Sequence, residues 1–161
     1  MRWLQWSTYD LEKGIGGVEV HAREVARELS KQGIKALLSS ASTDYETENW
    51  DVIHTHGSSI LPRSAYGRRG TTYVHTLHGT TFGRMWACRE FLWVGGYLAQ
   101  LREILAVVRA DVVFAVHPDL WLFRLARFFG KKTAVCGNGS DAGGDASTVS
   151  SPLPPALTVL L

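Results

Sequence analysis

The sequence is poor in cysteine and nearly balanced in charge, and each shortage excludes a class of protein. Its two cysteines, Cys88 and Cys136, lie far apart and in no metal-binding spacing. This excludes a disulfide framework and is typical of a reducing compartment. The formal net charge of +2 is too small to indicate nucleic-acid binding. We therefore expect a cytoplasmic protein with no nucleic-acid partner.

Long hydrophobic runs are also missing. The most apolar stretch, Phe91 to Val108, is interrupted by Gln100, Arg102 and Glu103. Because a membrane-spanning helix needs ~20 predominantly apolar residues, we expect no transmembrane segment. Residues 1–10 lack the apolar core of a secretory signal. The 161 residues, of which 45% are hydrophobic and 20% charged, suit one globular domain with a real core.

Short apolar segments alternate with longer segments of helical periodicity. The expected strands are Arg2–Ser7, Ile34–Ser39, Trp50–His54, Thr71–Leu77, Asp111–Val116 and Lys132–Cys136. The expected helices are Gly17–Gln32, Arg84–Arg109 with a weak point at Gly95–Gly96, and Asp119–Phe129, while Ser40–Asn49 is expected to be a loop. The alternation predicts an α/β fold, a Rossmann-like three-layer domain with a mainly parallel sheet. We expect a strand order near 3-2-1-4-5-6.

A glycine-rich loop, Lys13 to Glu19, joins the first expected strand to the first expected helix. Glycines allow a tight turn here and remove side chains that would block a ligand. The unpaired amides and positive dipole end of the helix would attract a phosphate or another anion. A plain surface turn that begins an ordinary helix accounts for the same residues equally well.

Polar clusters recur where the expected strands end. They are Gly14–Glu19, His54–Ser59, His75–Thr81, His117 and Gly137–Asp141. In open parallel sheets, ligands bind beyond the carboxyl ends of the strands. The coincidence of all five clusters predicts a functional crevice at that edge.

The order of these motifs is similar to that of a known family. The segments that carry the likeness are Trp6–Asp10 leading into Gly16–Glu19, Leu29–Ala36, Asp51–Gly57 with Thr76–Thr80, Ala110–Val116, and Asn138–Asp141. In this order they resemble the N-terminal half of the retaining glycosyltransferases of the GT-B fold, family 4. The resemblance covers nearly the whole chain.

The resemblance implies an enzyme that moves a sugar from a nucleotide-sugar donor to a carbohydrate or lipid-linked acceptor, with retention and without a cofactor. It implies a Rossmann-like acceptor-side domain over residues 1–141, a linker over 142–155, and the first strand of a missing C-terminal domain over 156–161. The nucleotide pocket and a pair of glutamates would belong to that second domain. We therefore expect this chain alone to be inactive.

The resemblance also implies roles for individual residues. His78 would be the catalytic residue that reaches the transferred sugar. The donor would be bound by Gly16, Gly17 and Asn138, and the acceptor by His56, Gly57, Gly79 and Thr80. The chain departs from the family pattern at Gly137, Ser140 and His117–Pro118, which puts the hinge geometry in doubt.

Other functions fit parts of the pattern. A dinucleotide-binding module would need a third glycine where Glu19 stands, and an acidic residue at the end of the second strand, where Ser39 and Ser40 are found. A non-catalytic sugar-binding domain is a further alternative.

The histidines also suit roles outside catalysis. A metal site of His54, His56, His75 and His78 lacks a carboxylate or cysteine to complete it, so we expect no metal. For His54 and His75 a buried structural role is the preferred interpretation, whereas His56 suits either role. His21 is most simply structural.

Aromatic residues gather between residues 86 and 97. Trp86, Phe91, Trp93 and Tyr97, with Arg84 and Arg89, are consistent with weak peripheral contact at the inner face of a membrane. The preferred interpretation is that these aromatic side chains pack on the sheet and the arginines are solvated.

Overall fold

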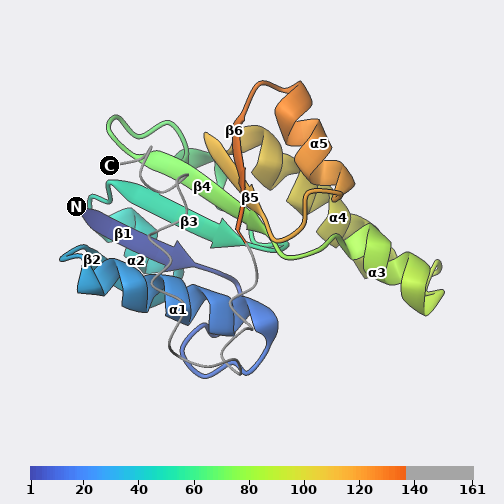
Figure 1. Cartoon of the computed structure of the whole chain (residues 1–161), viewed down its shortest axis with the longest axis horizontal. Helices are drawn as coiled ribbons and strands as arrows, with labels where there is room; N and C mark the ends of the chain where they lie inside the picture. Colours follow the sequence, from blue (N-terminus) through green and yellow to red (C-terminus); the bar gives the residue numbers. More distant parts are fainter. Residues whose placement is uncertain (137–161) are drawn as a thin grey trace, which may run out of the picture.

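Six parallel strands form one sheet with helices on both faces, in a computed structural model that describes residues 1–136 (Figure 1). The strands are β1 (Arg2–Trp6), β2 (Lys35–Ser39), β3 (Val52–His56), β4 (Thr72–Leu77), β5 (Val112–Ala115) and β6 (Lys132–Val135). The helices are α1 (Gly17–Lys31), α2 (Ser42–Thr47), α3 (Thr81–Cys88), α4 (Val94–Arg109) and α5 (Trp121–Phe128), with a 3-10 turn η1 (Arg63–Ala65). All neighbouring strands pair in parallel. The predicted Rossmann-like α/β class is confirmed.

The predicted strand order is wrong. The strands lie in the order β2-β1-β3-β4-β5-β6, so β3 is central and β2 is at the edge. β3 pairs with β1 on one side and β4 on the other, and all its residues are buried, whereas Lys35 and Leu37 of β2 are exposed. The chain reverses its direction across the sheet between β1 and β3, and ligand crevices of open sheets lie at such a point.

Alternate side chains of β1, β3, β4 and β5 pack on opposite faces of the sheet, where they form apolar clusters. On one face, Val25 and Leu29 of α1 pack over Trp3 and Val52. The amphipathic pattern of α1 buries Ala22, Ala26 and Leu29, and Gly33 with φ +75° ends the segment in a left-handed conformation.

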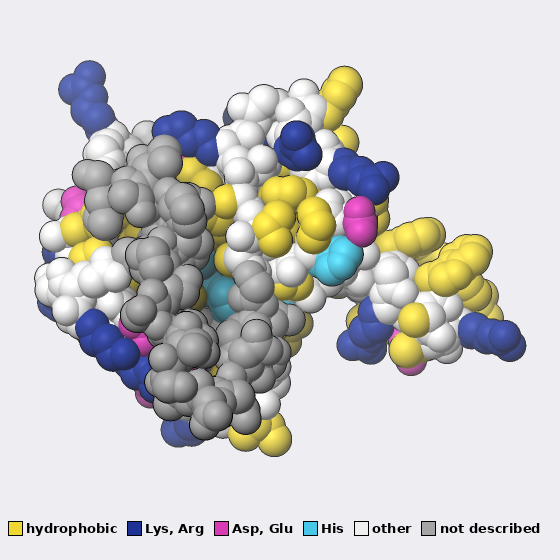
Figure 2. Space-filling view, viewed as in Figure 1, with side chains coloured by type: hydrophobic (Ala, Val, Ile, Leu, Met, Phe, Trp, Pro, Cys, Tyr) yellow, Lys and Arg dark blue, Asp and Glu magenta, His cyan; other side chains and the backbone are white. Residues whose placement is uncertain are grey.

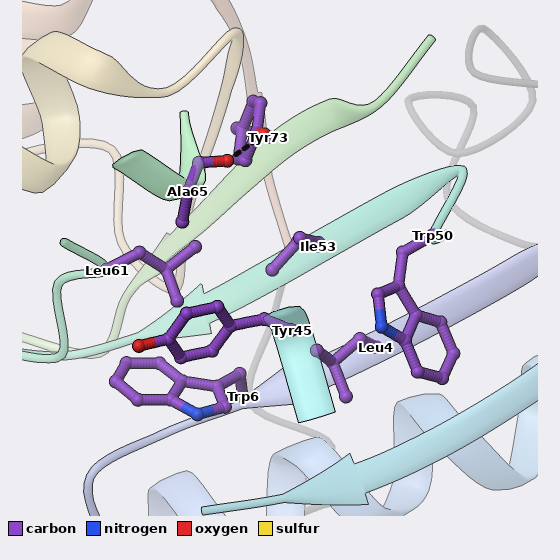
Figure 3. Packing of buried hydrophobic residues seen from close by; sticks show 8 residues of the cluster. All are labelled: Leu4, Trp6, Tyr45, Trp50, Ile53, Leu61, Ala65 and Tyr73. Atoms are coloured by element: carbon purple, nitrogen blue, oxygen red, sulfur yellow. Dashed lines mark hydrogen bonds between the residues drawn. The ribbon is translucent and has the colours of Figure 1, made fainter. Parts of the chain in front are cut away.

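The opposite face is covered by α2, η1, α4 and α5. Tyr45 of α2 and Ala65 of η1 pack with Trp6 and Tyr73, and the Tyr73 hydroxyl donates a hydrogen bond to the Ala65 carbonyl (Figure 3). Leu122, Phe123 and Ala126 of α5 join a further apolar cluster with strands β4 and β5. The sheet is thus the middle layer of three.

Two helix predictions need correction. The segment expected to be a loop, Ser40–Asn49, contains α2, which its polar sequence concealed. The long helix expected over Arg84–Arg109 is two helices, α3 and α4, and the break is not at Gly95–Gly96. It lies at Arg89, which ends α3 in a left-handed conformation with φ 57°.

The predictions for Asn138, the linker over 142–155 and the strand over 156–161 lie outside the described residues. Among the helices that the structure describes, none combines the length and apolar character needed to cross a membrane.

Candidate functional site

Four polar side chains lie together near the carboxyl ends of three adjacent strands. Gln5 comes from β1, His54 and His56 from β3, and His78 follows β4. Gln5, His54 and His56 are buried on the face that α1 covers, and His78 is partly buried. The reversal between β1 and β3 therefore puts them at the predicted crevice.

A chain of hydrogen bonds links Gln5 to His78 through His56. The His56 Nε2–H donates to the Gln5 Oε1 at 2.5 Å, which leaves His56 Nδ1 as an acceptor. The His78 Nε2–H donates to that nitrogen at 3.2 Å. In a neutral chain of this kind, the remaining nitrogen of His78, Nδ1, carries a free lone pair.

Burial keeps the His56 and His78 side chains neutral at pH 7. Desolvation, with smaller contributions from the neighbouring histidines, lowers the pKa of His56 well below its usual 6.5. Desolvation likewise lowers the pKa of His78 to about 3. His78 is therefore a hydrogen-bond acceptor at Nδ1 and is unsuited to donate a proton as a general acid.

The Nδ1 atom of His78 finds no hydrogen-bond partner among residues 1–136, although it is buried. A buried acceptor without a partner costs about 1–3 kcal/mol. A ligand hydroxyl placed there would satisfy it.

His21 of α1 belongs to the same cluster. Its ring lies edge-on to His78 with centroids 4.9 Å apart, and 6.0 Å from His56. Burial lowers its pKa as well. Sequence reasoning assigned His21 only a structural role, although its position beside Ala22 and Val25 on the apolar face of the helix marked it as facing the sheet.

The glycine-rich loop is held by its own side chains. Arg23 Nη1 donates to the carbonyls of Leu11, Glu12 and Gly14, at 2.9, 3.2 and 2.7 Å. Asp10 Oδ1 accepts hydrogen bonds from the amides of Glu12 and Lys13. The loop is thus ordered before any ligand arrives, and no local pattern in the sequence indicated this role of Arg23.

The first turn of α1 is open to a ligand. Gly16 precedes the helix, and no side chain of the described residues caps it. A Cβ atom on Gly17 would meet nothing within 4 Å, whereas one on Gly16 would lie 2.5 Å from Glu19 Oε2. The Glu19 carboxylate therefore lies beside the amides that an anion would use.

The first turn of α3 is closed, by contrast. Thr80 Oγ1 accepts from the Gly83 amide at 3.0 Å, and Gln100 Oε1 accepts from the Phe82 amide at 2.7 Å. Glu103 accepts from both the amide and the hydroxyl of Thr81. An anion near His78 would therefore find its amide donors at α1 and not at α3.

Serine and threonine hydroxyls tie the end of β1 to the end of β3. Ser59 Oγ lies 3.0 Å from Ser7 Oγ and accepts from the Thr8 amide at 3.0 Å. Gly57, with φ +58°, turns the chain out of β3 in a conformation that favours glycine. These contacts fix the rim around His56.

The predicted residues thus fall into three groups. His56, Gly57, His78 and the α1 terminus with Gly16 and Gly17 lie on one rim, where His21 contacts both His56 and His78. Gly79 is exposed and Thr80 is a helix cap, and both directly follow His78. Asn138 lies outside the described residues.

His54 and His75 are buried on opposite faces of the sheet. His54 Nε2 pairs with Thr76 Oγ1 at 2.6 Å, and His75 Nδ1 pairs with Thr55 Oγ1 at 2.8 Å. In the described part of the chain, no three histidine, cysteine or carboxylate side chains are arranged to hold a metal ion.

A hollow of about 250 Å³ lies beside the glycine-rich loop, at the ends of β1 and β2. It is lined by Asp10, Leu11, Glu12, Lys13, Leu38, Ser39, Ser40, Ala41 and Asp44. None of these residues belongs to the histidine cluster. No family profile matches the sequence, and a search of curated proteins finds no significant match.

Proposed function

We propose that this chain is the acceptor-side half of a retaining glycosyltransferase that uses a nucleotide-sugar donor. One observation carries the proposal: the neutral chain from Gln5 through His56 ends at a buried, unpartnered Nδ1 of His78, on the same rim as the open first turn of α1. To bind a sugar diphosphate, a site needs a group that accepts a hydrogen bond from a sugar hydroxyl and, beside it, a site for the diphosphate anion.

In the proposed reaction, the bond between the anomeric carbon and the diphosphate oxygen breaks, and a bond to the acceptor oxygen forms. The acceptor proton leaves with the diphosphate. The amides of Gly16 and Gly17, with the dipole of α1, stabilise the charge that develops on the leaving group. His78 Nδ1 accepts a hydrogen bond from a sugar hydroxyl and so positions the transferred ring.

The resemblance supports two further parts of the proposal. The acceptor would approach over His56, Gly57, Gly79 and Thr80. The nucleotide base and the donor-side glutamates would be held by a second domain, which would close over the rim and exclude water.

The test is a titration followed by NMR of the protein labelled with ¹⁵N. Sugar nucleotides should shift both the amide signals of Gly16 and Gly17 and the ring nitrogen signals of His78. A nucleoside diphosphate without sugar should shift the glycine signals alone. We expect weak binding, roughly millimolar, which corresponds to about 4 kcal/mol.

The ring signals also report the protonation that the proposal needs. His78 should show a protonated Nε2 and a bare Nδ1 at pH 7, and a bound sugar should change Nδ1 more than Nε2. If sugar nucleotides leave the glycine amides unmoved, or move His78 no more than the diphosphate does, the proposed function is wrong.

A further inference from the structure

Helix α3 projects from the end of the sheet, away from the rest of the domain (Figure 1). Together with the first half of α4 it forms a helical hairpin over residues 81–102, here called the α3–α4 hairpin. Met85 of α3 is buried against α4, and its side chain fills the space that a Cβ atom on Gly96 would occupy.

The hairpin exposes a concentration of large apolar side chains. Figure 2 shows hydrophobic atoms clustered on the projection. The exposed side chains are Phe82, Trp86, Phe91, Leu92, Trp93, Val94, Tyr97, Leu98 and Leu101. Leu92 is 95% exposed and Trp86 is 66% exposed. The preferred interpretation from sequence, that these aromatic residues pack on the sheet, is therefore wrong.

Helix α4 buries polar side chains and exposes apolar ones over its first turns. Its polar residues Gln100 and Glu103 are buried, because they cap the start of α3. Its apolar residues Val94, Leu98 and Leu101 consequently face solvent. Capping α3 thus fixes an apolar stripe on the outside of the molecule.

Contacts within the hairpin hold this surface in shape. Trp86 and Phe91 pack edge to face at 5.4 Å, and the Tyr97 hydroxyl donates to the Phe91 carbonyl at 2.9 Å. The Arg84 guanidinium lies 5.1 Å from the centre of the Trp93 ring. The apolar tip is preformed, so little ordering entropy would oppose its binding.

The charge of the α3–α4 hairpin favours an anionic partner. Arg84, Arg89 and Arg102 are exposed, and Glu90 is the one acidic residue between positions 81 and 102. Tryptophan, tyrosine and arginine around an aliphatic tip are typical of side chains at the headgroup level of a bilayer. A two-fold contact between copies would bring like-charged arginines together, which disfavours a dimer.

We propose that the α3–α4 hairpin docks on an anionic lipid bilayer. Trp86, Leu92 and Trp93 enter the boundary between headgroups and acyl chains, and Arg84 and Arg89 contact lipid phosphates. This inference is independent of the proposed function. Because α3 begins directly after His78, Gly79 and Thr80, docking would also hold the candidate site close to the lipid surface.

The test measures partition of the protein onto vesicles by co-sedimentation. Binding should be clear with phosphatidylglycerol–phosphatidylcholine vesicles, weak with phosphatidylcholine alone, and reduced by salt. Arg84→Gln with Arg89→Gln should weaken binding by roughly 5-fold per arginine. Trp86→Ser with Leu92→Ser should weaken it by roughly tenfold or more on either lipid.

The matched control carries Phe128→Ser and Arg127→Gln on α5. Phe128 is 84% exposed, and Arg127 is exposed beside it. This variant should bind like the wild type. All variants are first checked by circular dichroism, so that loss of binding is measured only on folded protein.

A fluorophore on the exposed Cys88 gives a second measurement. Burial raises the pKa of the Cys136 thiol to about 11, so labelling at neutral pH selects Cys88. Blue-shifted emission on anionic vesicles is expected. Equal binding by the hairpin variants and the control would overturn the proposal, as would a dimer in sedimentation equilibrium that Trp86→Ser with Leu92→Ser disrupts.

Discussion

The carboxylate of Glu103 on α4 accepts two hydrogen bonds from Thr81, the first residue of α3: one from its amide at 3.0 Å and one from its hydroxyl at 2.7 Å. This contact satisfies donors that every helix leaves unpaired at its start. It also supplies the negative charge that the dipole of α3 favours. The same contact both closes this helix end to ligands and turns the apolar side of α4 outward.

Glu103→Ala should destabilise the protein by about 2 kcal/mol, because two donors at the start of α3 lose their acceptor. Urea unfolding measures the change in free energy. Hydrogen exchange should speed up most at the amide of Thr81, because the Phe82 amide keeps its acceptor on Gln100. Glu24→Ala on the exposed side of α1 is the control, and it should change stability by less than roughly 0.5 kcal/mol.

The buried histidines on both faces of the sheet make stability depend on pH. The pKa values of His21, His54, His56, His75 and His78 are all lowered by burial. In the unfolded chain these groups take up protons near pH 6.5, while the folded protein does not. Stability is therefore complete above pH 6.5 and falls as the pH drops from about 6.5 toward 4, where the pKa of folded His75 is about 4.

The slope of the unfolding free energy against pH can be assigned to individual histidines. Each histidine that stays neutral only in the folded state contributes about 1.4 kcal/mol per pH unit. His75→Gln should reduce the slope of unfolding free energy between pH 6 and 5 by roughly that amount. Phe128→Ser, at an exposed position without a titratable group, should leave it unchanged; equal slopes in all three proteins would contradict the assignment.

The sequence predicted the class of the fold but not the arrangement of its parts. Alternating strands and helices indicated a parallel sheet, and the polar ends of the strands predicted the rim where His56 and His78 lie. The strand order failed because a parallel connection can add a strand on either side, and only the pairing of β3 with both β1 and β4 shows where it lies. Helix α2 lacked the apolar periodicity that reveals a helix.

Side-chain contacts between elements were beyond the sequence. Nothing local to Glu103 or Arg23 indicates that one caps another helix and the other holds a loop, because both contacts depend on how helices pack. The exposed side chains of the hairpin were also beyond the sequence. Trp86 and Leu92 are residue types that usually lie in a core, and the projection of α3 leaves them in solvent.

Gly17→Ala should separate ligand approach from folding. An alanine Cβ at this position meets no atom within 4 Å, so stability should be unchanged or slightly higher. The added methyl group would stand where a diphosphate approaches the α1 amides. We expect the affinity for nucleoside diphosphates, measured by NMR titration, to fall by roughly tenfold, equivalent to about 1.4 kcal/mol.

Gly16→Ala tests the role of the neighbouring carboxylate. A Cβ there would meet only the far end of the flexible Glu19 side chain, which can move aside, so this variant should lose affinity with little change in stability. Unchanged diphosphate affinity in Gly17→Ala would argue that the first turn of α1 is not the anion site.

The 161-residue chain alone should not transfer sugar at a useful rate, because an open rim leaves the diphosphate hydrogen-bonded to water as well as to the glycine amides. Supplying a nucleotide-binding second domain, in one chain or in trans, should restore transfer. In that enzyme His78→Ala should lower kcat/KM by roughly tenfold, the worth of one hydrogen bond of about 1.4 kcal/mol.

A second variant distinguishes positioning from general damage. Gln5→Leu removes the acceptor that orients His56, so the proton between His56 and His78 is no longer fixed and Nδ1 of His78 ceases to be a reliable acceptor. Transfer should fall by less than in His78→Ala, and the ¹⁵N ring signals of both histidines should show mixed tautomers. Combining the two substitutions should cost little more than His78→Ala alone, because Gln5 acts through the ring that is then missing. Additive losses would mean that Gln5 and His78 contribute independently, and turnover at an ordinary rate by the chain alone would mean that its site is complete without a second domain.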